Sequence, residues 1–145
     1  MTLKQKPWTI RNRQRLLIAV MDQLAGAAHI AFEGDLSTSN LLRSPDASHE
    51  ETSTLKRNTL WPKQDFVVLP LERNHIKMII AAIGGTVPKT ILHIQIEKDG
   101  VLQLGFYDNF QHVAFGEGLN DQFFERLQSE GIAEPSAHAS RDALS

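Results

Sequence analysis

The alternation of apolar and polar residues between positions 91 and 112 constrains the fold more than any other feature of this chain. The stretch reads "ILHIQIEKDGVLQLGFYDNFQH", with apolar residues at every second position on both sides of Asp99-Gly100. A period of two is typical of a β-strand that buries one face. The pattern therefore predicts an antiparallel hairpin with one apolar and one polar face.

The length of the hairpin loop decides which residues share a face. A two-residue turn would place Ile96 opposite Gln103, which mixes the faces. A three-residue loop over 98–100 matches the apolar residues in pairs: Ile96 with Leu102, Ile94 with Leu104, and Leu92 with Phe106. Because a slip of one residue turns every side chain over, the pattern favours the three-residue loop, with a left-handed Gly100.

The polar face of this hairpin is our first candidate binding surface. We expect it to be exposed, and it carries a mixture of charged, amide and aromatic groups: His93, Gln95, Glu97, Gln103 and Tyr107. Such residues suit contact with another protein. They are also what a solvated sheet face carries without any function.

Three segments repeat apolar residues with helical spacing. We predict helices from Thr9 to Gly26, from Arg73 to Gly84, and from Asn120 to Gly131. Each has one apolar stripe, so all three are expected to cover the same face of a sheet. The run "LLIAVM" in the first helix follows basic residues, as in a signal peptide. It is short and Asp22 interrupts it, so we interpret it as part of a helix.

The order of elements predicts an α+β fold. Further strands are expected at 29–36, 65–71 and 112–116, with Pro70 at the end of its strand or on an edge because it cannot donate to a ladder. The result is a single-domain two-layer sandwich over 1–134, in the order αββαβββα. Its sheet is mixed but mostly antiparallel, has about five strands, and carries three helices on one face. Residues 37–64 form a long loop whose first part, 37–54, is expected to be mobile, and 135–145 a disordered tail.

Composition excludes several classes of function. The apolar fraction of 41% is that of a globular protein, and no apolar run approaches the roughly 18 residues that a membrane span requires. The absence of cysteine excludes disulfides, thiol nucleophiles and thiolate metal sites. It is compatible with the cytoplasm, where we place the protein. We expect no cofactor, no metal and no membrane partner, and the oligomeric state stays open.

The net charge of −2 conceals a strong segregation. Residues 1–15 contain basic residues and no acid, and the helix dipole disfavours the cations in a first turn. Two clusters combine cations with tryptophan: Trp8, Arg11, Arg13 and Arg15, and then Lys56, Arg57, Trp61 and Lys63. This combination suits an anionic partner such as nucleic acid or a phosphoanion. The alternative is that the cations are solvated or pair with acidic segments of the same chain.

One constellation could support catalysis. His93, Asp108 and His112 could form a general base or bind a divalent metal, but the sequence does not fix their geometry. We therefore favour a non-catalytic protein-binding module, an adaptor or a neutralising protein, that uses the sheet face and the basic N-terminal helix. The alternatives are a nucleic-acid or phosphoanion binder using the two basic clusters, and a small His/Asp hydrolase.

Overall fold

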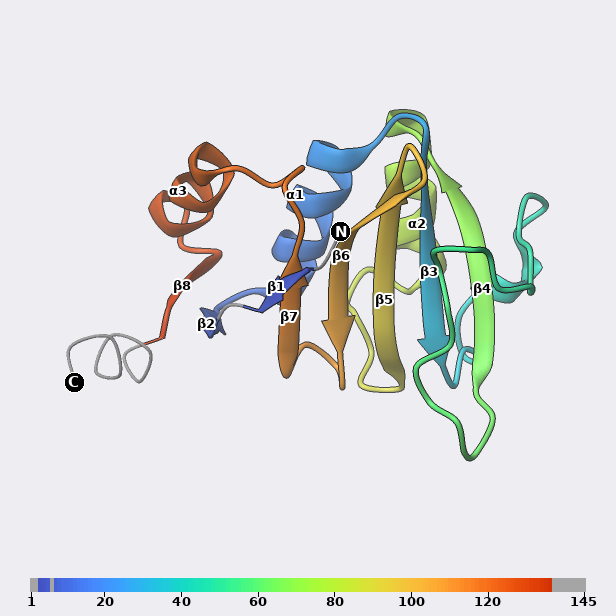
Figure 1. Cartoon of the computed structure of the whole chain (residues 1–145). Coiled ribbons are helices and arrows are strands. Elements are labelled where there is room, and N and C mark those ends of the chain that lie inside the picture. Colours follow the sequence, from blue (N-terminus) through green and yellow to red (C-terminus); the bar gives the residue numbers. More distant parts are fainter. Residues whose placement is uncertain (1–2, 6, 137–145) are drawn as a thin grey trace.

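An antiparallel sheet forms one layer of the structure and helices form the other (Figure 1). The computed structural model describes residues 3–5 and 7–136. The six strands lie in the order β1 (Lys4–Gln5), β7 (His112–Phe115), β6 (Val101–Tyr107), β5 (Ile91–Lys98), β3 (Ala28–Gly34) and β4 (Asp65–Leu71). The predicted α+β two-layer sandwich is confirmed, with every strand pair of this sheet antiparallel.

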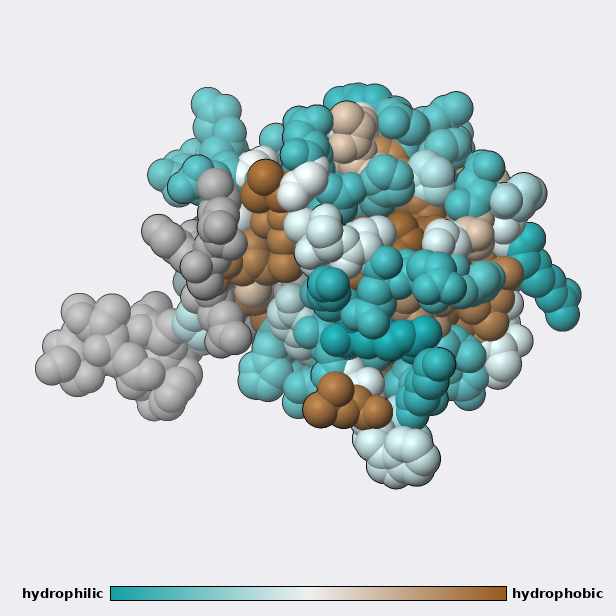
Figure 2. Space-filling model, turned by 45° about the vertical axis from the view of Figure 1, so that its right-hand side comes forward, coloured by the Kyte–Doolittle hydropathy of each residue, from teal (hydrophilic) through white to brown (hydrophobic). Residues whose placement is uncertain are grey.

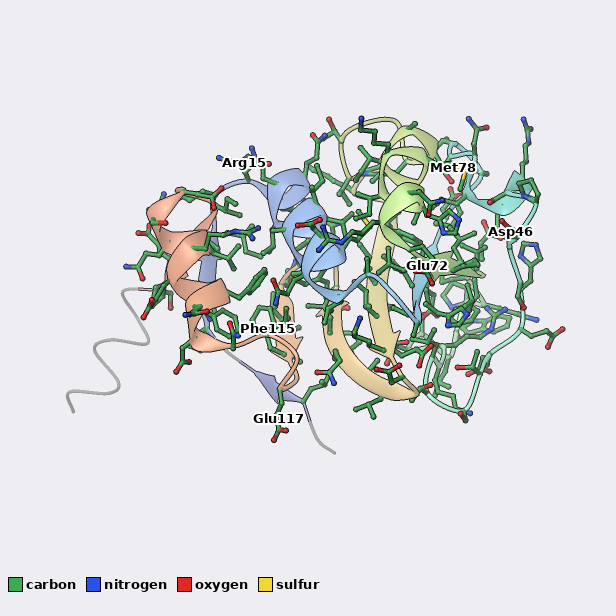
Figure 3. All side chains as sticks on the ribbon, turned by 90° about the horizontal axis from the view of Figure 1, so that it is seen from above. Arg15, Asp46, Glu72, Met78, Phe115 and Glu117 are labelled. Carbon is green, nitrogen blue, oxygen red and sulfur yellow. The ribbon has the colours of Figure 1, made fainter. Side chains whose placement is uncertain are left out.

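The helices lie together on one side of the sheet, as Figure 3 shows from above. They are α1 (Arg13–Leu24), α2 (Ile76–Ala82) and α3 (Asp121–Ser129), with 3₁₀ turns η1 (Leu41–Arg43) and η2 (Arg73–His75). The predicted stripe of α1, from Leu17 to Leu24, is buried. It packs in one core with Phe32 and Ile96 from the sheet.

The first helix begins later than predicted. Its N-cap is Asn12, whose side chain accepts a hydrogen bond from the Arg15 N–H. Thr9, the expected N-cap, lies instead in β2 (Trp8–Ile10), which pairs with β8 (Ala133–Pro135). Strands of two or three residues are too short to show a period, so β1, β2 and β8 were not predicted. The predicted tail begins inside β8, and its part from 137 onward lies outside the described residues.

The prediction of a three-residue hairpin loop is wrong. Lys98 lies opposite Val101, and the two residues between them have positive φ, 52° at Asp99 and 80° at Gly100. Two left-handed residues are the requirement of a type I′ turn, whose twist matches that of the strands it joins. The hairpin therefore closes with the two-residue turn that the hydrophobic pattern argued against.

A β-bulge in β6 reconciles this turn with the buried pattern. Glu97 lies opposite Leu102, but Ile96 lies opposite Leu104, so Gln103 is an extra residue. The insertion returns Ile96 and Leu104 to the helix-covered face. Leu102, which we expected on that face, packs instead against the apolar cluster on the opposite face.

Lys98 connects the end of this hairpin to α1. Its ammonium group donates to the carbonyl oxygens of Leu24, Ala25 and Gly26 at 3.0, 3.0 and 2.7 Å. A cation is favoured at a helix C-terminus, where carbonyls lack partners within the helix. This contact helps to fix α1 over the sheet.

The edge strand β4 has the bounds that the sequence predicts, and Pro70 lies on it as expected. Its outer edge is largely covered. Ser48 exchanges two backbone hydrogen bonds with Val68, and the Phe66 carbonyl lies 3.3 Å from His49 Nδ1. Pro70 has no N–H to offer. This edge is therefore poorly suited to pairing with a strand of another chain.

Candidate functional site

The long loop covers the second face of the sheet over β3 to β5, so this part is not the exposed surface that we predicted, whereas Gln103 and Tyr107 on β6 are partly exposed. Leu55 is fully buried against Ala31, Phe66 and Val68. Figure 1 shows the segment between η1 and β4 running across the side of the sheet away from the helices. Four polar residues are buried as well, namely Glu33, His93, Gln95 and Glu97. We call residues 55–59 the strap.

Glu33 anchors the strap most directly. Its side chain is 2% exposed, and its two carboxylate oxygens accept from the N–H groups of Asn58 at 2.7 Å and Thr59 at 3.1 Å. A buried carboxylate needs such partners to offset its desolvation. Glu33 therefore acts as a structural acceptor for loop backbone. It was not among our candidate residues, because a single acid in an alternating strand looks like a solvated one.

His93 and Gln95 continue this contact along β5. Gln95 Oε1 accepts from the Lys56 N–H at 3.2 Å, and Gln95 Nε2 donates to the Tyr107 hydroxyl at 3.3 Å. His93 Nε2 lies 2.8 Å from Thr59 Oγ1. Of the residues expected to meet a partner protein, His93 and Gln95 therefore meet the protein's own loop instead.

The tautomer of His93 follows from its second contact. The Asp108 N–H donates to His93 Nδ1 at 3.2 Å, so Nδ1 is an acceptor and a neutral ring carries its proton on Nε2. Nε2 then donates to Thr59 Oγ1 and cannot remove a proton from it. This geometry does not activate Thr59 as a nucleophile.

The remaining candidates of the sheet face are also engaged. Glu97 accepts from the Gly100 N–H at 2.8 Å and lies 2.7 Å from His29 Nδ1, so it serves the hairpin turn. Gln103, the bulge residue, accepts from the Gly118 N–H at 2.7 Å. The ring of Tyr107 lies against Gly105, where a Cβ atom would overlap it.

The catalytic constellation is not assembled around one point. Asp108 contacts His93 through its backbone, while its carboxylate lies 3.6 Å from His112 Nε2. His93 is buried and His112 is exposed. Among the described residues, no three His, Asp or Glu side chains come together in a way that could hold a metal ion.

The N-terminal basic cluster is engaged within the protein. Arg11 pairs with Glu134, and Arg13 donates to the Asn109 side chain. Arg15 lies 3.6 Å from the Glu130 carboxylate and donates to the Glu130 carbonyl at 3.2 Å, at the end of α3. The positive charge of Arg15 is unfavourable at the start of α1 but favourable at the C-terminal end of α3.

Trp8 also has a structural partner. Its ring lies 5.4 Å from that of Phe124 in α3, and its side chain is only partly exposed. The N-terminal cluster therefore contacts other parts of the same chain and does not form an open cationic patch.

The second cluster lies at the tip of the strap and is much more open. Leu60 is 94% exposed and Trp61 is 85% exposed. Lys56 and Lys63 are exposed and form no ion pair with the described residues. Arg57 is held in place: it donates to the Gln64 carbonyl at 2.6 Å and lies 5.0 Å from the Phe66 ring.

Leu60 was missed because one leucine in a polar loop gives no pattern. Figure 2, which brings the β4 side forward, shows one hydrophobic group projecting from the lower part of the surface, apart from the other hydrophobic areas. Beside the tip is a hollow of about 390 Å³, lined in part by His49, Arg57, Lys63 and Asp65. We call Leu60, Trp61 and this hollow the loop-tip site.

The ends of the long loop are tied together. The Leu36 N–H donates to Asp65 Oδ2 at 3.0 Å, which joins the end of β3 to the start of β4. The Ser37 hydroxyl and N–H both donate to Asp35 and lower the pKa of that carboxyl group. These contacts fix where the loop leaves the sheet. Mobility of 37–54 remains a prediction.

Neither the helices of the chain nor comparison with known proteins indicates what this site binds. No helix in residues 3–5 and 7–136 is long and apolar enough to cross a membrane. Comparison with protein-family models, with curated proteins and with solved structures finds no match to this chain.

Proposed function

We propose that this protein is a non-catalytic protein-binding module that acts through the loop-tip site. The observation that carries the proposal is the exposure of Leu60 and Trp61, 94% and 85%, on a loop whose neighbouring residues are bonded to the sheet. Folded chains gain nothing from displaying two adjacent large apolar side chains in water. A partner that covers them gains their burial.

The anchoring of the strap suits this use. Asn58 and Thr59, which precede the tip directly, are bound through their N–H groups to Glu33. A segment that is already ordered loses less conformational entropy when it binds than a mobile one. Tryptophan is also among the residues enriched at binding hot spots. Leu60 and Trp61 are thus candidates for preorganised anchors.

The charge around the tip indicates the kind of partner. Lys56 and Lys63 make no ion pair with the described residues, and Arg57 and Lys63 line the adjacent hollow. Unpaired cations around an apolar anchor favour a partner with an apolar pocket and an acidic rim. Asp65 also lines the hollow and would repel an acidic group. We therefore expect an acidic group of the partner to bind near Arg57 and Lys63.

Captured partners from the native host provide the test. The purified protein, a Leu60→Ser/Trp61→Ala variant and a Lys77→Glu variant serve as three baits. Lys77 is exposed on α2, in the helix layer away from the tip. We expect a partner retained by the wild type and by the Lys77→Glu bait but lost from the double variant. A partner held equally by all three would place the binding surface elsewhere.

The kinetics of partner binding then distinguish residues that anchor the partner from charged residues that steer its approach. Lys63→Glu should mainly slow association and reduce its salt dependence, because rim charges act on encounter. Trp61→Ala should mainly raise the dissociation rate. Equal effects of the two substitutions on both rates would contradict this division of roles.

One observation favours a second candidate function. An exposed tryptophan near the exposed lysines Lys56 and Lys63 also suits single-stranded nucleic acid, in which bases stack on aromatic rings. The neighbouring exposed Glu50 and Glu51 oppose phosphate. Salt-dependent binding of a labelled oligonucleotide that Trp61→Ala abolishes would favour this candidate over a protein partner.

We keep the cytoplasm as the proposed location, because a chain without cysteine suits a reducing compartment.

A further inference from the structure

A second cavity lies between η1 and α2, on the helix side of β4. Its volume is about 330 Å³, at the lower end of the range for small-molecule sites. The floor and one wall are apolar and come from β4 and α2, with Leu69, Met78, Ile79 and Ala81 among them. The Asn40 N–H donates to the Ala82 carbonyl at 2.9 Å, which ties the two sides together.

The opposite wall is polar, and its outer part is open to solvent because Asn40 and Arg43 are exposed. Asn40, Arg43 and Ser44 line it. Neither the Asn40 amide group nor the Arg43 guanidinium forms a side-chain hydrogen bond or ion pair with the described residues. The Ser44 hydroxyl is shielded from solvent and also has no partner there. A buried polar atom without a partner, such as this hydroxyl oxygen, is rare and calls for an explanation.

Met78 adds an observation on the apolar side. It is 47% exposed, although it is a large apolar residue on a short helix. In Figure 3 it lies on the same side of the molecule as Asp46, which follows the η1 segment. Methionine is flexible and adapts its shape to a bound group, so it suits the wall of a ligand site.

We propose that this cavity binds a small organic anion with an aliphatic body. The aliphatic part lies along Met78 and Ile79, and the carboxylate or phosphate group meets Arg43 and Asn40. The chemistry follows from the walls: one side offers apolar area, and the other offers amide and hydroxyl groups with a cation that has no ion-pair partner among residues 3–5 and 7–136. This inference is independent of the loop-tip site, whose hollow shares no lining residue with this cavity.

Methionine methyl groups give a direct readout. In protein labelled with ¹³C at its methionine methyl groups, Met78 reports on the cavity and the fully buried Met21 reports on the core. Titration with octanoate should shift the Met78 resonance until it saturates, while that of Met21 stays in place. Octanol serves as the neutral probe of the same length. An unchanged Met78 resonance up to the solubility limit of octanoate would overturn the proposal.

Three variants test the assigned roles. Arg43→Gln should weaken octanoate about two- to fivefold and leave octanol unchanged, as expected for a partly solvated ion pair. Lys77→Gln removes the same charge from the same region without lining the cavity and should change neither. Ala81→Phe should fill the cavity and abolish both shifts, with an unchanged Met21 resonance showing that the fold persists. Equal effects of Arg43→Gln and Lys77→Gln, or full binding by Ala81→Phe, would refute the site.

Discussion

The helix face of the sheet and the opposite face over β3 to β5 are both buried, but they are held by different interactions. On the helix side, Phe32, Ile96 and Leu104 belong to one continuous apolar core that includes all three helices. On the loop side, a cluster of four buried apolar residues lies beside buried polar residues that bind loop backbone. An alternating strand thus shows which face is more apolar. It does not show that the other face is exposed to solvent.

This difference predicts unequal stability. Apolar burial on the helix side gains roughly 25 cal/mol for each Å² removed from water. The hydrogen bonds that hold the strap each contribute about 0.5–1.5 kcal/mol net, or about 1.5–3 kcal/mol where a charged group takes part. We therefore expect the strap to open at a lower free energy than the helix layer.

The largest effect is expected from a truncation on the helix face. Phe32 is fully buried in the middle of β3. Phe32→Ala should lower the free energy of unfolding by about 3–5 kcal/mol, through lost burial and a cavity. Denaturant unfolding followed by circular dichroism measures this change. A loss below about 1 kcal/mol would mean that Phe32 does not pack in the main core.

Matched leucines compare the two faces directly. Leu104 and Leu55 are both fully buried, one under the helices and the other under the strap. Leu104→Ala should cost about 3–4 kcal/mol and Leu55→Ala about 2 kcal/mol, because the strap can shift to close its cavity. The same unfolding assay serves for both variants. An equal or larger cost at Leu55 would remove the proposed difference between the faces.

A smaller effect is expected at Glu33. Glu33→Gln replaces one of its two acceptor oxygens by a donor, so the N–H of Asn58 or Thr59 loses its partner. The expected loss of stability is about 1–3 kcal/mol. Glu125→Gln, at an exposed position on α3, is the control and should change stability by less than about 0.5 kcal/mol. Identical curves for the two variants would show that Glu33 does not hold the strap.

The smallest effect on stability is expected at the tip itself. Trp61→Ala should change the free energy of unfolding by no more than about 0.5 kcal/mol, because its side chain is 85% exposed. Its effect on partner binding should be much larger, more than about 2 kcal/mol if it is an anchor. Isothermal titration with the captured partner measures the second quantity. A large loss of stability would instead give Trp61 a role in the fold.

Much of the fold could be predicted because its signals are local. The bounds of β4 and the capping residues of α3 follow from short apolar runs beside Pro70, Asn120 and Gly131. The bulge at Gln103 could not be predicted in this way. A three-residue loop and a two-residue turn with a bulge both align apolar faces, and only the structure distinguishes them.

The site was harder to predict because its contacts are distant in sequence. Arg11 and Arg15 find Glu134 and Glu130 at the other end of the chain, so an apparent cationic patch is neutralised by residues that no local window contains. The sheet face was misjudged for the same reason. Nothing near His93 or Gln95 in sequence indicates that residues 56–59 will cover them.

Amide hydrogen exchange tests the central claim, that the strap is bonded to the polar face of the sheet. The N–H groups of Lys56, Asn58 and Thr59 donate to Gln95 and Glu33, whereas those of Leu60 and Trp61 make no hydrogen bond with the described residues. We predict slow exchange at the first three positions and fast exchange at the next two, with Glu33→Gln lowering protection at Asn58 or Thr59 and not at Lys56. Equally fast exchange across 56–61 in the wild-type protein would contradict the account, because the polar face would then be open to solvent.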